Sequence, residues 1–564
     1  MFQDLLDTVS GVAQFLGLSL FSINGWHRQP PLWTPAYAAN LTNGDLDFVA
    51  NCSRFSALVD IPGAVTHFTQ YVPAGTNLLF PDNHPSCGLT SQSVSSDICR
   101  LAMSVPTSST SEISFEAWFP RNYSGRFLST GNRGLANFTR LACVFALILL
   151  YRLLGVGGCI PYDELAYTTS MGFASVGTNS GHNTTSADAF LNNPDAVQDF
   201  AYRSVHTGTI VGKELTSHFY GFPYAKSYYF GCSTGGRQGF KEAQDFPEDF
   251  DGILAGAPAI AFTRLVSWGA SFLQKTASVD DDTFVTPELW AIVYEALLQQ
   301  CDALDGAVDG LLEHPDLCQF NPEVLLCRKG RTSGCLTGKQ AERVRAVFSP
   351  LYGREGQLLY PRLQPGVNTK KQMPFYVAGV PFGSATEWFQ NVVYNDTTWN
   401  PRSFSLQDAM VAIEQNPFNI DTWNGDLNSF ATNGGKLLTF HGLQDFVISS
   451  EISSLYYAHV ARTMGLPPAE LDSFYRLFFV SGMDHCQGGD GASVIGQSSS
   501  SSVGADPDEN VLMALVRWVE EGVAPEVLKA AKLDKKGAVG YWRSNCKWPL
   551  KNRYHTEEGS WKCE

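Results

Sequence analysis

The sequence has few charged residues, and basic residues are the scarcer kind. Of its 564 residues 17% are charged, and 39 lysines and arginines face 55 aspartates and glutamates, for a formal net charge of −16. The chain shows no basic stripe that would bind a phosphate backbone, which argues against nucleic acid as a partner. An acidic surface also gains little from anionic membranes. The hydrophobic fraction of 44% is that of a packed globular protein.

Long hydrophobic runs are also missing. One apolar stretch, 141–151, is about half as long as the roughly 20 residues that a membrane-spanning helix requires, and Arg152 ends it. We therefore expect no membrane span and no membrane partner.

A basic leader is missing too, although cysteines are plentiful. Residues 11–22 are apolar, but Asp4 and Asp7 occupy the region where a signal peptide is basic. Segment 1–30 is either a degenerate signal region or the true start lies outside this sequence. Thirteen cysteines fit an oxidising compartment. Six N-x-S/T sequons agree with a secreted, extracellular glycoprotein; they begin at Asn40, Asn51, Asn122, Asn137, Asn183 and Asn395.

Three short apolar runs are each followed at once by glycine and polar residues. They are 226–230, 436–440 and 476–480. Runs of this length and composition are typical of buried parallel strands. Because open α/β sheets carry their sites beyond the carboxyl ends of such strands, the pattern predicts an α/β fold with a site there.

The first of these runs leads into a G-x-S-x-G pattern. In Gly231-Cys232-Ser233-Thr234-Gly235 the serine would occupy a tight strand-to-helix turn, whose strained backbone requires small neighbours. Residues 236–244 are typical of the helix that follows. Strand, turn and helix together predict that Ser233 is the nucleophile of an α/β-hydrolase core.

A serine nucleophile needs a base and a carboxylate. The imidazole takes the hydroxyl proton, and the carboxylate fixes its tautomer. In this fold the chain order is Ser, Asp/Glu, His. His485 follows the last core strand and Asp445 the one before, so we predict the triad Ser233, Asp445, His485. His441 and His459 are the alternative bases, but neither follows the last strand.

Two cysteines adjoin the predicted nucleophile and base. If Ser233 and His485 are within hydrogen-bond reach, Cys232 and Cys486 should come within the Cα separation of about 4.4–6.8 Å that a disulfide requires. Such a bond would keep the reacting pair in register when a lid moves. The alternative is two unrelated buried cysteines.

The oxyanion hole should use the N–H of Thr234, the residue after the nucleophile. A second donor should come from the glycine-rich loop after an early strand. The candidate loop is 127–134, and Gly131 is our choice within it.

Between the strands, segment 257–424 has a different character. Strands are hard to recognise there, 287–300 looks helical, and four cysteines fall between 301 and 335. We interpret 257–424 as a lid domain, and 31–256 with 425–564 as the catalytic domain.

A metal site is predicted inside this segment. Residues 301–311 carry three carboxylates and two glycines in a tight loop, and clustered hard oxygen ligands suit Ca²⁺. An EF-hand is excluded because Leu304 and Gly306 stand where acidic ligands are needed. The alternative is a solvated acidic turn. The ion would be structural.

Several motifs together resemble the fungal tannase and feruloyl esterase family. They are Cys-Ser-Thr-Gly-Gly at 232–236, His-Gly-Leu-Gln-Asp at 441–445, His-Cys at 485–486 and the segment 250–258. The resemblance runs from about Cys52 to Cys563. It implies an α/β-hydrolase core, a large lid, bound calcium and hydrolysis of phenolic esters.

The resemblance also implies specific ligands and pairings. Calcium would be held by the side chains of Asp302, Asp305 and Asp309 and by the carbonyls of Ala307 and Leu311. The further disulfides would be Cys52–Cys99, Cys87–Cys159, Cys301–Cys318, Cys327–Cys335 and Cys546–Cys563.

One segment departs from the family pattern. Family members pass from a loop like 131–135 almost directly to a motif like Gly158-Cys159-Ile160, whereas this chain interposes 136–156. The segment contains Cys143, and without it twelve cysteines remain (13 − 1), an even number. Our hypothesis is a translated intron or gene-model error; an intact mass of the secreted protein that includes these residues would refute it. If the residues are genuine, they lengthen or displace the oxyanion loop.

The leading functional hypothesis is a serine carboxylic ester hydrolase, a feruloyl esterase acting on hydroxycinnamate esters of plant cell-wall polysaccharides such as xylan. Thr234 and Gln238 look closer to the feruloyl esterase branch than to tannases. The second hypothesis is a tannase that cleaves galloyl esters. The third is an inactive hydrolase scaffold that serves as a binding protein. Nothing in the sequence indicates an oligomeric state.

Overall fold

A nine-stranded sheet forms the centre of the protein. The computed structural model describes residues 43–132, 156–328, 330, 333–372 and 376–564. The strand order is β1-β4-β5-β7-β6-β8-β9-β12-β13. The strands are β1 (Val65–Val72), β4 (Ile98–Pro106), β5 (Glu112–Pro120), β6 (Arg126–Thr130), β7 (Phe173–Thr178), β8 (Lys226–Cys232), β9 (Gly252–Gly256), β12 (Lys436–Gly442) and β13 (Tyr475–Val480).

The sheet is antiparallel at one edge and parallel over the rest. β1, β4, β5 and β7 pair antiparallel in that order. From β7 through β6, β8, β9 and β12 to β13 every pairing is parallel. The three predicted apolar runs are therefore β8, β12 and β13, and their carboxyl ends lie at the same edge of the sheet.

Helices bury both faces of this sheet. The side chain of Tyr229 packs on one face, with α6 (Ser204–Tyr220), α7 (Thr234–Asp245) and α16 (Glu451–Met464). Tyr228 and Phe230 pack on the other face, with α4 (Tyr162–Ser170) and α18 (Val511–Glu521). Alternate residues of a strand point to opposite faces, and a strand covered on both sides must be apolar throughout. That requirement explains the uninterrupted apolar runs in the sequence.

The helices are short to medium in length. Around the sheet they are α2 (Asn43–Phe55), α4 (Tyr162–Ser170), α5 (Pro194–Gln198), α6 (Ser204–Tyr220), α7 (Thr234–Asp245), α16 (Glu451–Met464), α17 (Pro468–Leu471) and α18 (Val511–Glu521). Within the part of the chain that the structure describes, no helix combines the length and the apolar character that crossing a membrane demands.

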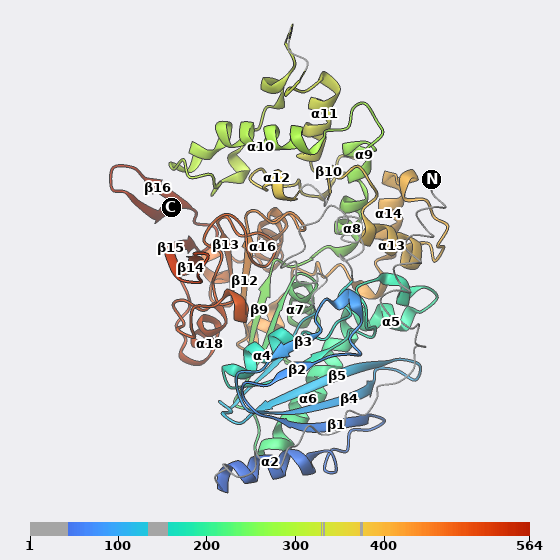
Figure 1. Ribbon diagram of the computed structural model, residues 1–564, viewed down its shortest axis with the longest axis vertical. Helices are drawn as coiled ribbons and strands as arrows, with labels where there is room; N and C mark the ends of the chain where they lie inside the picture. The colour runs from blue at the N-terminus through green and yellow to red at the C-terminus, as the bar shows by residue number, and fades with distance from the viewer. Residues whose placement is uncertain (1–42, 133–155, 329, 331–332, 373–375) are drawn as a thin grey trace. The chain divides into compact units, whose positions relative to one another are not determined.

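A mainly helical segment connects the neighbouring strands β9 and β12. Its helices are α8 (Phe262–Ala270), α9 (Phe272–Thr276), α10 (Pro287–Cys301), α11 (Gly338–Val347), α12 (Thr369–Gln372), α13 (Gly383–Trp388), α14 (Leu406–Gln415) and α15 (Asn428–Thr432). Figure 1 shows α10, α11 and α12 grouped away from the antiparallel strands β1, β4 and β5. The fully buried Trp268, Trp290 and Trp388 belong to the core of this segment. Its action as a lid stays a prediction.

Four two-stranded sheets complete the fold. They are β2 (Asn77–Leu79) with β3 (Ser91–Ser93), β10 (Leu351–Tyr352) with β11 (Leu358–Tyr360), β14 (Val527–Leu533) with β15 (Val539–Cys546), and β16 (Asn552–His555) with β17 (Ser560–Cys563). Two sequence predictions fall outside the described residues, namely the degenerate signal region 1–30 and residues 136–155 of the anomalous insertion with Cys143.

Candidate active site

Ser233 occupies the turn between β8 and α7. Its φ of 66° and ψ of −119° are strained for a residue with a side chain. Its backbone N–H donates to the carbonyl of Gly256 at 3.0 Å, and its carbonyl accepts from Ala259 at 3.1 Å. A Cβ on Gly231 would lie 2.8 Å from the backbone of Gly235, closer than real contacts allow. The predicted small neighbours are therefore required by close backbone packing.

His485 and Asp445 form a buried pair. Nδ1 of His485 lies 2.7 Å from Oδ2 of Asp445. The other carboxylate oxygen, Oδ1, accepts the backbone N–H groups of Val447 at 2.8 Å and Ile448 at 2.9 Å. This geometry fixes the ring and leaves Nε2 for a reacting proton.

The electrostatics keep Asp445 ionised. Burial alone would raise the pKa of this carboxyl, but the imidazoles of His485 and His441 and their hydrogen bonds outweigh burial and lower the pKa below its usual range. Since the folded pKa is depressed, the stability that the ionised group contributes is present above about pH 3.9 and is lost only as pH falls toward the folded value.

Ser233 and His485 lie on adjacent, largely buried loops. Their exposed fractions are 8% and 6%. Among the described residues, Nε2 of His485 has no hydrogen-bond partner. Catalytic hydrogen bonds are often long without substrate, so the free Nε2 is compatible with its predicted role as the base.

His441, an alternative base in the sequence analysis, bonds the carboxylate of Asp445 in the structure. Its Nε2 lies 3.1 Å from Oδ2 of Asp445, and its Nδ1 lies 2.8 Å from Oγ of Ser453. His441 is completely buried. His459 stacks on Trp423 with ring centroids 5.2 Å apart. His441 is thus a second partner of Asp445, which the sequence pattern alone did not indicate.

A disulfide joins the loops of the predicted nucleophile and base. Cys232 and Cys486 are bonded, with Cα atoms 6.1 Å apart across 254 residues of sequence. The five other predicted pairs are bonded as well. Because Cys232 directly precedes Ser233 and Cys486 directly follows His485, this bond holds the two side chains at one end of the sheet.

We expect the double variant Cys232→Ser/Cys486→Ser to lose about 2–5 kcal/mol of unfolding free energy, since cross-linking distant residues restricts the unfolded chain most. It should also lower kcat, because the loop of His485 is released. Chemical denaturation and ester hydrolysis measure both effects. The matched control, Cys327→Ser/Cys335→Ser, opens a bond across only 8 residues and should lose less stability and no activity. Equal effects in both variants would contradict the expectation.

The predicted oxyanion donors fare differently. The N–H of Thr234, the first residue of α7, makes no hydrogen bond among the described residues, as expected for a first-turn amide. The N–H of Gly131 donates to the carbonyl of Phe230 at 2.8 Å. That of Asn132 donates to Oε1 of Gln238 at 2.9 Å. The N–H of Gly131 is therefore already engaged with the neighbouring strand β8, and its role as an oxyanion donor stays a prediction.

Comparisons with known proteins decide the family. A sequence profile described as "Tannase and feruloyl esterase" matches residues 98–563. The chain belongs to the tannase and feruloyl esterase family.

Relatives in this family align with nearly the whole chain. It is 50% identical to a probable feruloyl esterase B-2 from Aspergillus terreus and to a probable feruloyl esterase B-1 from Aspergillus flavus, each over 92% of this chain and 95% of the relative. The crystal structure of feruloyl esterase B from Aspergillus oryzae is similar, with a TM-score of 0.86 and 48% identity over 92% of this chain and all of that one. The predicted family and α/β-hydrolase-type fold are confirmed.

Tannin acyl hydrolase from Aspergillus niger shares the fold of this family member. The TM-score is 0.69, at 22% identity over 92% of this chain and 95% of that one. At that identity the likeness concerns the fold alone.

A buried polar network joins α7 to the ends of β6 and β7. Gln238 Nε2 donates to Oδ1 of Asn132 at 3.0 Å and lies 3.2 Å from Oγ of Ser180. Asn132 Nδ2 in turn donates to the carbonyls of Thr178 at 2.6 Å and Cys159 at 3.0 Å. The network fixes the backbone next to the nucleophile. Sequence reasoning missed it because its members are far apart in the chain.

The predicted calcium loop is compact and partly buried. Asp302 and Asp305 are 7% and 1% exposed. Burial raises the pKa of both carboxyls, although backbone N–H groups oppose this. Gly306, at φ 96°, could not carry a side chain because a Cβ would lie 2.3 Å from the carbonyl of Tyr554.

The carboxylates of this loop are engaged with protein groups. Asp309 pairs with Arg543. No three carboxylate, His or Cys ligand atoms of this loop lie within 4.8 Å of one another among the described residues. Carboxylate and carbonyl oxygens are the donors that calcium prefers, so the chemistry of the donor set fits calcium, and the site stays a prediction.

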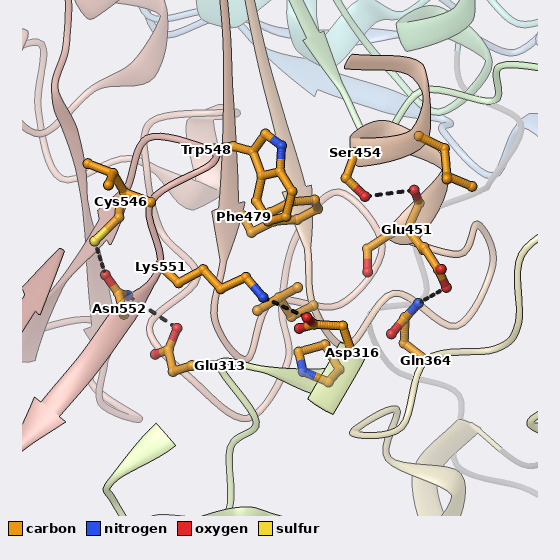
Figure 2. A pocket seen from close by; sticks show the side chains of 15 residues that line it. Glu313, Asp316, Gln364, Glu451, Ser454, Phe479, Cys546, Trp548, Lys551 and Asn552 are labelled. Atoms are coloured by element: carbon orange, nitrogen blue, oxygen red, sulfur yellow. Dashed lines mark hydrogen bonds and ion pairs between the residues drawn. The ribbon is translucent and has the colours of Figure 1, made fainter. Parts of the chain in front are cut away.

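A separate cavity of about 140 Å³ lies between β13, α16 and the C-terminal residues. Figure 2 shows Trp548 beside Phe479 on one side, and on the other the ion pair of Lys551 with Asp316. Ser233, Asp445 and His485 are not among the residues that line it. The cavity is therefore distinct from the candidate active site.

Proposed function

We propose that this protein is a secreted feruloyl esterase that hydrolyses hydroxycinnamoyl esters of plant cell-wall polysaccharide. The observation that carries the proposal is the buried His485–Asp445 pair, linked to the loop of Ser233 by the Cys232–Cys486 bond. The names of the relatives, probable feruloyl esterases of type B, support the substrate class.

The chemistry follows from the positions of these groups. Nε2 of His485 takes the proton of Ser233, whose Oγ attacks the ester carbonyl. The oxyanion is stabilised by the free N–H of Thr234 and a second donor. The imidazolium, stabilised by Asp445, then protonates the leaving alcohol. Water activated by the same imidazole hydrolyses the acyl-enzyme.

The alternatives are a tannase and an inactive binding protein. Similarity to a tannin acyl hydrolase concerns the fold alone. Complete Ser, Asp and His positions argue against a scaffold that has lost its chemistry. A feruloyl esterase is therefore the better supported function.

Hydrolysis of methyl ferulate and methyl gallate by the purified protein tests the proposal. Faster turnover of ferulate is expected; a gallate preference would favour the tannase. If neither ester is hydrolysed, a variant lacking 136–156 is assayed in the same way. Activity in that variant would indicate an esterase whose sequence contains a gene-model error at 136–156. Continued inactivity would favour the binding protein.

Secretion and glycosylation are part of the proposal. Six disulfides are typical of an oxidising compartment. Among the sequons, Asn122, Asn183 and Asn395 have exposed positions. Mass spectrometry of the secreted protein before and after glycosidase treatment would detect the sugars, and an unchanged mass would contradict this part.

A structural calcium ion also belongs to the proposal. The side chains of Asp302, Asp305 and Asp309 and the carbonyls of Ala307 and Leu311 would hold it. A bound ion would neutralise two largely buried carboxylates and fix the loop against β15 and β16, and none of its ligands belongs to the predicted triad.

Calcium removal should therefore lower stability and leave the chemistry intact. At a calcium concentration about 1,000 times Kd, binding adds about 4 kcal/mol to folding. In protein freed of other metal ions and returned to Ca²⁺ alone, we expect a chelator to lower Tm by several degrees, and Asp305→Asn to abolish that response. The exposed Asp280→Asn is the matched control and should melt like the wild type. A wild-type Tm that is unaffected by the chelator would contradict calcium binding.

A further inference from the structure

Three side chains with metal-binding atoms meet between α6 and α7, in a cluster that the proposed reaction does not use. His206 lies in the first turn of α6, Glu242 near the end of α7, and Asp249 in the loop before β9. One ligand atom from each lies within 4.8 Å of the others, and no other such trio occurs among the described residues. The cluster lies at the opposite end of α7 from Ser233.

Glu242 is the unusual member. It is only 1% exposed, and neither of its carboxyl oxygens has a hydrogen-bond partner among the described residues. Of its charged neighbours, the one with the largest effect is Asp249, another acid. Burial and then the charge of Asp249 raise the pKa of Glu242. Because a buried carboxylate without a donor is costly, this group requires either a shared proton or a cation.

The other two ligands form a partly open side of the cluster. Nδ1 of His206 lies 2.7 Å from Oδ2 of Asp249, and the two side chains are 27% and 14% exposed. The imidazole is held flat against Phe246, with ring centroids 3.7 Å apart. An ion could therefore enter past His206 and Asp249 and reach Glu242 behind them.

Lys213 lies beside the cluster, and its charge lowers the pKa of Glu242 by less than burial and Asp249 raise it. Nζ of Lys213 donates to the backbone carbonyl of Asp249 and not to its side chain. Lys213 therefore occupies none of the three side-chain ligand positions.

We propose that His206, Glu242 and Asp249 bind one divalent transition-metal ion of the Zn²⁺ class. An imidazole with two carboxylates suits such ions, whereas the all-oxygen loop around Asp305 suits Ca²⁺. Bonds of about 2.0–2.2 Å to each ligand allow ligand separations up to about 4.4 Å, so the cluster needs to contract by only a few tenths of an ångström at most. The ion fastens the end of α7 to α6.

Zinc binding by the full-length protein tests the proposal. The wild type is stripped with a chelator and returned to excess Ca²⁺, so that the calcium loop is filled. It is then equilibrated with ZnCl₂ and passed through gel filtration, and its zinc content is measured by mass spectrometry. One equivalent per chain is expected, together with a Tm above that of the zinc-free sample.

The variants separate a metal from a shared proton. Glu242→Gln keeps the shape of the side chain but removes a ligand. It should weaken Zn²⁺ binding by at least about 100-fold, because mutation of residues that only hydrogen-bond to metal ligands already lowers metal affinity by about 10–100-fold. Glu248→Gln, an exposed acid of the same loop, is the matched control and should keep the ion. His206→Gln, at a partly exposed position, replaces Glu242→Gln if the latter does not fold. A wild type that holds no more zinc than Glu242→Gln overturns the proposal and favours a proton shared with Asp249.

Discussion

Ser233→Ala is expected to lower kcat for methyl ferulate on the order of 10⁶-fold, as loss of a serine nucleophile does in other triads. The side chain is small and almost buried, at 8% exposure, and its removal leaves the turn between β8 and α7 intact. We therefore expect an unchanged Tm. Steady-state hydrolysis and thermal melting measure the two effects.

Two controls make this result specific to the triad. Ser217→Ala, on the remote α6, removes a hydroxyl bonded only to a carbonyl of its own helix and should keep full activity. The double variant Ser233→Ala/His485→Ala should lose no more activity than the single one, because the two residues act as a unit. A large additional loss would show that His485 acts independently of Ser233.

Asp445→Asn is expected to reduce kcat by about 10⁴-fold at nearly unchanged substrate affinity, through the tautomer of His485. The N–H groups of Val447 and Ile448 point at Oδ1, so the amide oxygen must take that position. The NH₂ group then faces Nδ1 of His485, which can only accept. The proton of the neutral ring moves to Nε2, the atom that should receive the proton of Ser233.

His441 gives this prediction a further test. Its Nε2 also faces Oδ2 of Asp445, and it would meet the same NH₂ group. His441→Gln should therefore lower kcat much less than Asp445→Asn, because the contact between His485 and Asp445 survives. If the two variants are equally impaired, the loss comes from disruption of the buried cluster and not from the wrong tautomer.

The sequence allowed the strands and the disulfide-linked loops to be predicted because their signals are local. A strand buried on both faces reads as an unbroken apolar run, and Ser233 needs small neighbours within two positions. The pairing of Cys232 with Cys486 then followed from the fold order of nucleophile and base. Each of these inferences starts from residues that are neighbours in the chain, such as Cys232 beside Ser233 and Cys486 beside His485.

The contacts that the sequence did not indicate depend on neighbours that are distant in the chain. The N–H of Gly131, predicted as an oxyanion donor, bonds the carbonyl of Phe230 in the next strand. The network of Gln238, Asn132 and Ser180 joins three separate elements. The meeting of His206 with Glu242 depends on how two helices pack, which no periodicity in the sequence records.

The bond between Cys232 and Cys486 makes the chain from the nucleophile to the base a closed covalent ring. That ring contains the whole segment 257–424 and the strand that precedes Asp445. After a single cut by a protease within 257–424, the two resulting fragments therefore stay joined by this disulfide. The nicked protein would migrate as one species on a non-reducing gel and as two fragments after reduction, with Ser233 on one fragment and His485 on the other.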